Sequence, residues 1–236
     1  MKTATLTQLR KDQRTKRPVA LATDMSTGAE ALVYHDEATG ELAGDAELMA
    51  AARQALQDDR SGVIAGSGGE VFIHVFNPPL RLILVGAVHI AQPLSRMATV
   101  GGYDVTVVDP RGSFNTEERF PGIALAHDWP DDAMRALDPD RRTAVVTLTH
   151  DPKLDDPGLS VAIRSGAFYV GALGSRGTHA KRVARLREDG FAENEIARIH
   201  APVGLAIGAK SPAEISVAIL AQITDVLHAR EKKAAA

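Results

Sequence analysis

The chain has 236 residues, of which 44% are hydrophobic and 24% charged, and its formal net charge is −3. This is the composition of a globular protein large enough for its own core, and the charge favours neither nucleic acid nor a membrane surface as a partner. The chain has no cysteine, which excludes disulfides, thiolate metal ligands and cysteine nucleophiles.

Two features of the sequence bear on location. No apolar run approaches the roughly 20 residues that a membrane-spanning helix needs. The basic residues 1–18 lack the apolar stretch of a secretory signal. We therefore expect a cytoplasmic protein that has no membrane partner and begins with a solvated helix or tail.

The first part of the chain predicts a small α+β domain. Apolar residues recur at helical spacing from Ala46 to Leu56, behind Asp45, which is a good helix cap. The stiff segment Asn77-Pro78-Pro79 indicates a linker, so we expect this domain to comprise residues 1–78. Its expected strands lie at residues 19–23, 31–35, 63–65 and 71–76.

Strands and helices alternate over residues 79–236, which implies a parallel sheet with right-handed crossovers. The predicted fold class is therefore α/β, with a Rossmann-type C-terminal domain beside the smaller N-terminal one. Strands are expected at residues 81–85, 105–108, 123–126, 143–148 and 168–170. Helices are expected up to residue 99, at residues 131–137, 154–165, 178–189 and 192–199, and from residue 211 onward.

The turn after the first of these strands has the layout of a dinucleotide-binding fingerprint. Gly86 permits a tight turn, and Asp109, which lies 23 residues later, would hold a ribose hydroxyl. The middle glycine of the fingerprint is replaced by Val88, whose branched side chain would hinder a pyrophosphate. Two interpretations remain open: a turn that binds a nucleotide-like ligand, and a Rossmann turn that no longer binds one tightly.

The loop after the fourth strand carries His150 and Asp151. It follows a strand near the expected reversal of the sheet order, where open α/β sheets bind ligands. The pair can hydrogen-bond a polar ligand or take part in acid–base chemistry. The alternative is that Asp151 caps the next helix and His150 packs beside it.

Gly174-Ser175-Arg176, after the fifth strand, is the most phosphate-like segment in the sequence. Small residues let a ligand approach, and an arginine at a helix start can grip a phosphate. The alternative is a helix start with a solvated basic face, which we expect for Lys181 and Arg182. A further anion-friendly position is predicted at Lys210 and Ser211, where the alternative is a loop that docks the last helix.

Six segments together resemble the XdhC/CoxI family, firmly over about residues 79–226 and loosely over residues 17–60. The family comprises accessory proteins that bind molybdenum cofactor and help to sulfurate it and insert it into xanthine dehydrogenase or a related molybdenum hydroxylase. The segments are, in order, GAVHIAQPL, VVDPR, FPG, TLTHDPKLD, YVGALGSR and IHAPVGLAIGAKSPAEI.

The resemblance implies a non-catalytic chaperone whose ligand is a molybdopterin, with a dinucleotide form as a second option. The implied partner is a molybdenum hydroxylase, with homodimerisation or pairing with another family member also expected. The implied cofactor-binding residues are Gly86, Ala87, Val88, His89, Asp109, Arg111, His150, Asp151, Gly174, Ser175 and Arg176, with no catalytic residue and no metal ligand assigned.

Departures from the family pattern leave other functions open. The stretch Gly40–Asp45 lacks a family cysteine, Val88 stands where the family has glycine, and Ala206 and Gln222 replace family acids. One alternative is an NAD(P)-dependent oxidoreductase that would use Gly86 and Asp109, with His150 as proton donor. The other is a degenerate interaction subunit that binds no small ligand.

Overall fold

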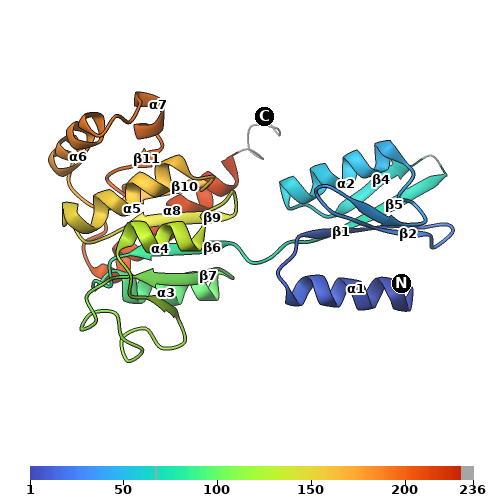
Figure 1. Cartoon of the computed structure of the whole chain (residues 1–236), viewed down its shortest axis with the longest axis horizontal. Coiled ribbons are helices and arrows are strands. Elements are labelled where there is room, and N and C mark those ends of the chain that lie inside the picture. The colour runs from blue at the N-terminus through green and yellow to red at the C-terminus, as the bar shows by residue number, and fades with distance from the viewer. Residues whose placement is uncertain (67, 230–236) are drawn as a thin grey trace. The chain divides into compact units, whose positions relative to one another are not determined.

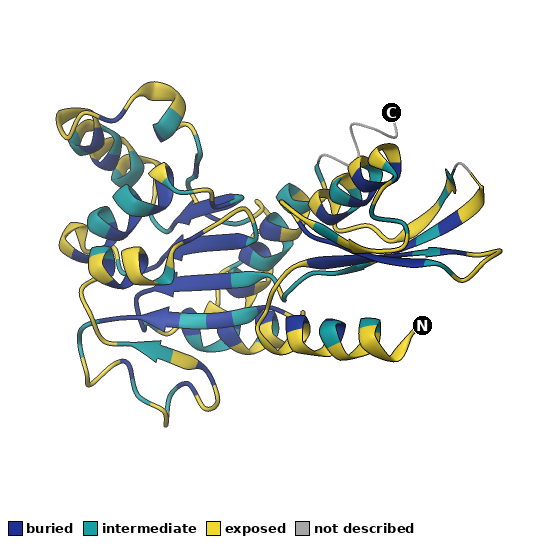
Figure 2. Ribbon diagram, turned by 45° about the vertical axis from the view of Figure 1, so that its right-hand side comes forward, coloured by how far each residue is buried: buried dark blue, intermediate teal, exposed yellow. Residues whose placement is uncertain are grey.

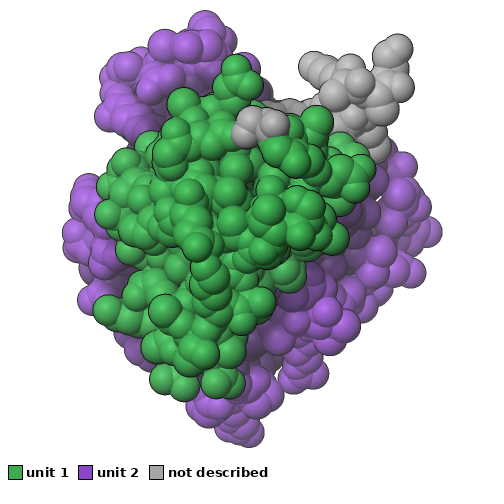
Figure 3. Space-filling view, turned by 90° about the vertical axis from the view of Figure 1, so that its right-hand side faces the viewer, with its two compact units in different colours: residues 1–78 green, residues 79–236 purple. Residues whose placement is uncertain are grey.

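The computed structural model describes residues 1–66 and 68–229 of the chain. The chain divides into two compact units, residues 1–78 and residues 79 onward (Figures 1 and 3). Each unit has its own sheet and its own hydrophobic core. In the described ranges, no helix combines the length and the apolar character of a membrane span.

The first unit is an antiparallel sheet with one helix on each face. The strand order is β3-β2-β1-β5-β4. In the central strand β1, Ala20 and Ala22 pack toward α2, whereas Val19 and Leu21 pack toward α1. The elements are α1 (Thr3–Arg14), β1 (Val19–Asp24), β2 (Glu30–Val33), β3 (Ala38–Gly40), α2 (Ala46–Asp58), β4 (Gly62–Gly66) and β5 (Gly69–Phe76).

Helix α1 is part of this unit and not a solvated tail. Its Leu9 and Asp12 are buried against the sheet. The Asp12 carboxylate accepts hydrogen bonds from the Tyr34 hydroxyl, at 2.8 Å, and from the Gln8 amide, at 2.9 Å. Burial and the bonded Asp12 carboxylate raise the pKa of Tyr34 to about 12. Because Leu9 is the one apolar side chain that α1 buries, the sequence shows no apolar stripe there.

The second unit contains a parallel sheet whose strand order is β11-β10-β9-β6-β7-β8. The chain starts at β6, moves outward to β8 and returns to the other side of β6, so the order reverses between β6 and β9 as in a Rossmann fold. The predicted fold class is confirmed. The strands are β6 (Arg81–Val85), β7 (Asp104–Val108), β8 (Ala124–Ala126), β9 (Thr143–Thr147), β10 (Tyr169–Ala172) and β11 (Ile199–His200).

Helices cover both faces of this sheet, and its strands are among the most buried elements in Figure 2. In β6, Leu82 and Leu84 pack toward α3 and α8, whereas Ile83 and Val85 pack toward α4 and α5. This burial on both sides explains the continuous apolar run of the strand. The helices are α3 (Ala91–Val100), α4 (Pro130–Leu137), α5 (Pro152–Arg164), α6 (Arg176–Glu188), α7 (Glu193–Ile196) and α8 (Pro212–Leu227).

The prediction from the sequence did not include the short strands β3 and β11. Strand β11 ends the segment expected to be helical over residues 192–199, because α7 ends at Ile196 and Ile199 then pairs with Val170 of β10. Helix α6 begins two residues before the expected start, since the Ser175 hydroxyl accepts a hydrogen bond from the Thr178 backbone N–H and caps it.

We predict that Tyr34→Phe weakens the first unit, because Asp12 loses one buried donor. The local free energy of opening should fall by about 1.5–3 kcal/mol, the scale of a hydrogen bond to a charged group. Hydrogen exchange of the α1 and β2 amides would measure the change. Thr7→Ala, which removes an exposed hydroxyl from α1, is the control. Equal exchange in the two variants would contradict the prediction.

Candidate functional site

The turn after β6 lies in contact with the loop after β9. Gly86 has φ +109°, and a Cβ at this position would overlap the Thr149 side chain and lie 3.3 Å from the Thr149 backbone nitrogen. The two loops meet here because β6 and β9 are neighbours at the reversal of the strand order. Gly86 is therefore required both for its backbone conformation and for the close approach of Thr149.

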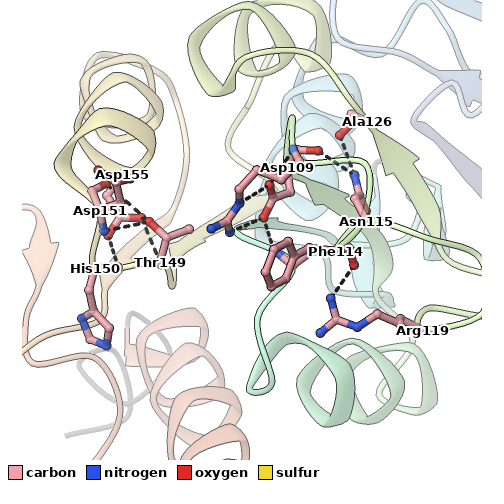
Figure 4. Close-up of polar contacts among 11 residues, drawn as sticks. Asp109, Phe114, Asn115, Arg119, Ala126, Thr149, His150, Asp151 and Asp155 are labelled. Carbon is pink, nitrogen blue, oxygen red and sulfur yellow. Dashed lines mark hydrogen bonds and ion pairs between the residues drawn. The ribbon is translucent and has the colours of Figure 1, made fainter.

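Asp109, at the end of β7, is fully buried and uses all of its acceptor capacity within the protein. Its Oδ1 accepts from the backbone nitrogen and Nε of Arg111, both at 2.9 Å. Its Oδ2 accepts from the Ala87 backbone nitrogen, at 2.8 Å, and from Arg111 Nη2, at 2.7 Å. A carboxylate has about four lone-pair sites, so none is left for the ribose hydroxyl that the sequence suggested. Figure 4 shows this cluster.

Burial and hydrogen bonding have opposite effects on the pKa of Asp109. Burial alone would raise it, but the hydrogen bonds from Arg111 and Ala87 outweigh burial and hold the pKa below its ordinary value. The guanidinium of Arg111 stays partly exposed and lies 4.6 Å from the centre of the Phe114 ring. The bond to Asp109 raises the pKa of Arg111, and the charges of Asp151 and Asp155 add to that effect. Arg111 thus offers a fixed positive charge at this edge of the sheet.

The loop after β9 is held by the buried carboxylate of Asp155. This group accepts hydrogen bonds from the Thr149 hydroxyl, at 2.7 Å, from the Thr149 backbone nitrogen, at 3.1 Å, and from the His150 backbone nitrogen, at 3.1 Å. His150 has φ +63°, a left-handed conformation that these bonds stabilise. Asp151 caps α5 by accepting from the Lys153 backbone nitrogen. In Figure 4 the His150 imidazole points away from the cluster of carboxylates.

A pocket of about 430 Å³ lies between the start of α5 and the start of α6. It brings together the loops that follow β9 and β10, including His150 and Ser175 from the predicted site. The lining residues are His150, Pro152, Asp155, Asp156, Ser175, Gly177, Thr178, Lys181, Arg182 and Arg185.

Arg182 and Arg185, and not Arg176, are the arginines of α6 that line this pocket, and Arg182 is the buried one. Arg176 is the first residue of the helix and is exposed. Arg182, which the sequence placed on a solvated basic face, has a side chain only 2% exposed. Burial lowers the pKa of Arg182, against the attraction of Asp155 and Asp156. Sequence reasoning missed this residue, and its spacing of four from the buried Leu186 was the available signal.

The other residues that were predicted to bind cofactor do not line this pocket. Ala87 is buried, Val88 is half-buried and packs against the core next to α3, and His89 is exposed. Gly174 has φ +140° and lies in the turn that precedes the Ser175 cap. The described ranges contain no cluster of three or more His, Asp or Glu side chains placed to hold a metal ion.

The loop before α8, predicted either to bind an anion or to dock the last helix, has the contacts of a docking loop. Glu214 accepts from the backbone nitrogens of Lys210 and Ser211, both at 2.8 Å, so a side chain of the helix already occupies the anion position. The Gln222 Oε1 accepts from the Tyr169 hydroxyl, at 2.6 Å, and from the Gly204 backbone nitrogen, at 2.8 Å. These bonds dock the loop onto the last helix.

The model of the XdhC Rossmann domain matches residues 82–223 of the chain. This range includes the turn at Gly86, both loops of the pocket and most of α8. The chain therefore belongs to the XdhC family, and the predicted family is confirmed.

Three curated relatives share this region. Uncharacterized protein YqeB of Escherichia coli K12 is 37% identical over 172 residues, which cover 71% of this chain and 31% of that protein. The molybdenum cofactor insertion chaperone PaoD of the same organism is 34% identical over 157 residues, 66% of this chain and 43% of PaoD. A probable xanthine dehydrogenase subunit of Bacillus subtilis 168 is 32% identical over 154 residues, 65% of this chain and 44% of that protein. The matched region is thus less than half the length of each relative.

A solved structure shares the fold. A xanthine dehydrogenase from Bacillus halodurans superposes with a TM-score of 0.76 over 98% of this chain and 68% of that chain, at 23% sequence identity.

We predict that Gly86→Ala destabilises the second unit by about 1–3 kcal/mol, the scale of a residue held in a strained conformation. The added Cβ would overlap Thr149 and take up a left-handed backbone. Thermal unfolding followed by circular dichroism would measure the loss. The control is Gly112→Ala, where a Cβ meets no atom within 4 Å. A similar melting temperature for both variants would refute the overlap.

We also predict that Asp109→Asn lowers stability at neutral pH by about 1–3 kcal/mol, because the variant leaves donors of Arg111 and Ala87 without a carboxylate. The folded pKa of Asp109 is depressed, so its contribution is complete above its ordinary value of 3.8 and is lost as the pH falls through the folded value. The stability difference between the variant and the wild-type chain should therefore shrink below pH 3.8. Urea unfolding at several pH values tests this, with the exposed Asp128→Asn as the control.

Proposed function

We propose that this protein binds molybdenum cofactor as its cargo and delivers it to a molybdenum hydroxylase of the xanthine dehydrogenase type during maturation of that enzyme. The observation that carries this proposal is the gathering of three loops at one edge of the Rossmann sheet. These loops follow β6, β9 and β10, all within the residues that match the family domain. The relationship to PaoD, whose name describes an insertion chaperone, supports the same role.

In this proposal each of the three loops contributes residues that hold the cofactor. Gly86, Ala87, Val88 and His89 form the turn beside the ligand. Asp109 does not touch it but fixes Arg111, which presents a positive charge. His150 offers an exposed hydrogen-bonding group, and its neighbour Asp151 fixes the start of α5.

Of the remaining predicted residues, Gly174 and Ser175 belong to the loop after β10, and Arg176 is the first residue of α6. This loop faces the phosphate of a molybdopterin or of its dinucleotide form. The 236 residues contain no cysteine and so cannot carry a persulfide. Sulfur added to bound cofactor would then come from another protein, and the roles of this chain would be retention and transfer.

The oxidoreductase alternative has less support than cofactor delivery. It needs Asp109 as an acceptor for ribose, but the Asp109 carboxylate is covered by Arg111 and has no exposed surface. It also needs a pyrophosphate to approach the backbone at Val88 as closely as it could at a glycine, but a branched side chain packs against the core there.

The test is to incubate the full chain with molybdenum cofactor and separate the mixture by gel filtration. Molybdenum and pterin should elute with the chain, near one of each per chain, and the elution volume also reports whether a dimer forms. A second assay adds the loaded chain to a cofactor-free molybdenum hydroxylase and measures the activity that appears. A folded chain that retains neither molybdenum nor pterin would refute cofactor binding.

We predict that His150→Ala reduces cofactor retention by about 2- to 10-fold, the scale of one hydrogen bond. The control is His127→Ala, which removes an exposed imidazole from a different loop. Binding measured at several cofactor concentrations would give the ratio. Unchanged affinity in the His150 variant would remove this residue from the site.

A further inference from the structure

We propose that the pocket between α5 and α6 is a phosphate-binding site in which the buried guanidinium of Arg182 holds the anion. This inference deepens the proposed function and rests on it for the identity of the ligand as a molybdopterin. The site itself requires only the chemistry of a phosphate monoester, so it can be tested without the cofactor.

The first observation is that Arg182 is buried with hydrogen-bonding capacity unused. Its Nη2 donates to the Leu173 carbonyl at 3.1 Å. The Nε and Nη1 atoms have no hydrogen-bond partner among the described residues. Buried N–H donors are nearly always satisfied, because leaving them without an acceptor is costly. An oxyanion in the pocket would supply the missing acceptors.

The neighbouring carboxylates do not fill this role. Asp155 Oδ2 lies 3.6 Å from Arg182 Nη2, and Asp156 Oδ1 lies 3.9 Å from Arg182 Nε, both beyond hydrogen-bond distance. Asp155 is committed to Thr149 and His150. Asp156 is paired with Arg185 through both of its oxygens.

The charge balance of the pocket also favours an anion. Its lining includes the cations of Lys181, Arg182 and Arg185 against the two carboxylates of Asp155 and Asp156. One positive charge is therefore in excess before His150 is counted. A guanidinium matches the oxygens of a phosphate, and charge-assisted hydrogen bonds to it are strong.

The start of α6 adds donors to the same pocket. The helix has 13 residues, and its first-turn N–H groups have no acceptor within the helix. Ser175 and Thr178 place hydroxyls 3.1 Å apart at this end. Gly177, which also lines the pocket, adds no side chain that would occupy the space.

Gly177→Asp is the decisive variant, because it tests the pocket without removing a buried group. A Cβ at Gly177 meets only the Ser175 hydroxyl oxygen, at an ordinary 3.7 Å. A carboxylate in the first turn of a helix is favourable to the helix, so the fold should be retained. The same carboxylate at the pocket would repel phosphate. Gly177→Ala is the matched control.

The experiment titrates inorganic phosphate into the full, cofactor-free chain by calorimetry in a phosphate-free buffer. The wild-type chain and Gly177→Ala should bind with affinities that agree within about twofold. Gly177→Asp should bind at least about tenfold more weakly, the scale of the repulsion between two like charges a few ångströms apart near a protein surface. Arg182→Met should show a similar loss, whereas Arg187→Met, which removes an exposed arginine of α6 outside the pocket, should bind like the wild-type chain.

Three results would overturn the site: no phosphate binding by the wild-type chain, equal binding by the two Gly177 variants, or a loss caused by Arg187→Met and not by Arg182→Met. Cofactor retention by the same variants separates the two proposals. Full retention of molybdenum and pterin by Gly177→Asp would overturn this site and leave the proposed function standing. Phosphate binding that Gly177→Asp abolishes, in a chain that retains no cofactor, would support this site and refute the proposed function.

Discussion

The close approach of Gly86 to Thr149 is the contact on which the carboxyl edge of the parallel sheet depends. It joins the first strand of the second unit to the strand that begins its other half, and so it lies at the point where the strand order reverses. Each side of the contact is fixed by a buried carboxylate. Asp109 binds the Ala87 backbone on one side, and Asp155 binds the backbone of Thr149 and His150 on the other.

These two carboxylates play similar structural roles but have opposite pKa shifts. The pKa of Asp109 is lowered because the Arg111 guanidinium bonds directly to it. Burial raises the pKa of Asp155. Its nearest guanidinium, that of Arg182, is too distant to offset burial with a hydrogen bond. The contrast shows that one arginine is committed to its carboxylate and the other is not. The arginine with unused donors is also the one that lines a pocket.

Much of this fold could be predicted from local patterns in the sequence. The apolar run of residues 81–85 belongs to a strand buried on both faces, and Asp45, Asp151 and Ser211 cap helices as expected. The missed elements lacked such patterns. Strand β11 has two residues, too few for any periodicity, and α1 buries a single apolar side chain beside a polar one. Their places are set by tertiary packing.

The site was harder to predict because it depends on which polar groups turn toward each other. Arg111 lies two residues after Asp109 in the sequence, and nothing there indicates that it folds back to occupy the carboxylate. The sequence does not distinguish Arg182 from Arg176, and only the packing of α6 against α5 buries the former. Sequence reasoning therefore located loops that the structure brings together but could not assign the individual charges.

The pairing of Asp109 with Arg111 also constrains which single substitutions the second unit tolerates. Loss of Arg111 alone would not make Asp109 a ribose-binding acid, because it would leave a buried carboxylate short of the donors that stabilise it. Gaining glycine at Val88 alone would remove a side chain that packs against the core. Each of these two substitutions is therefore expected to lower the stability of the second unit, so the turn tolerates change only when several of its residues change together.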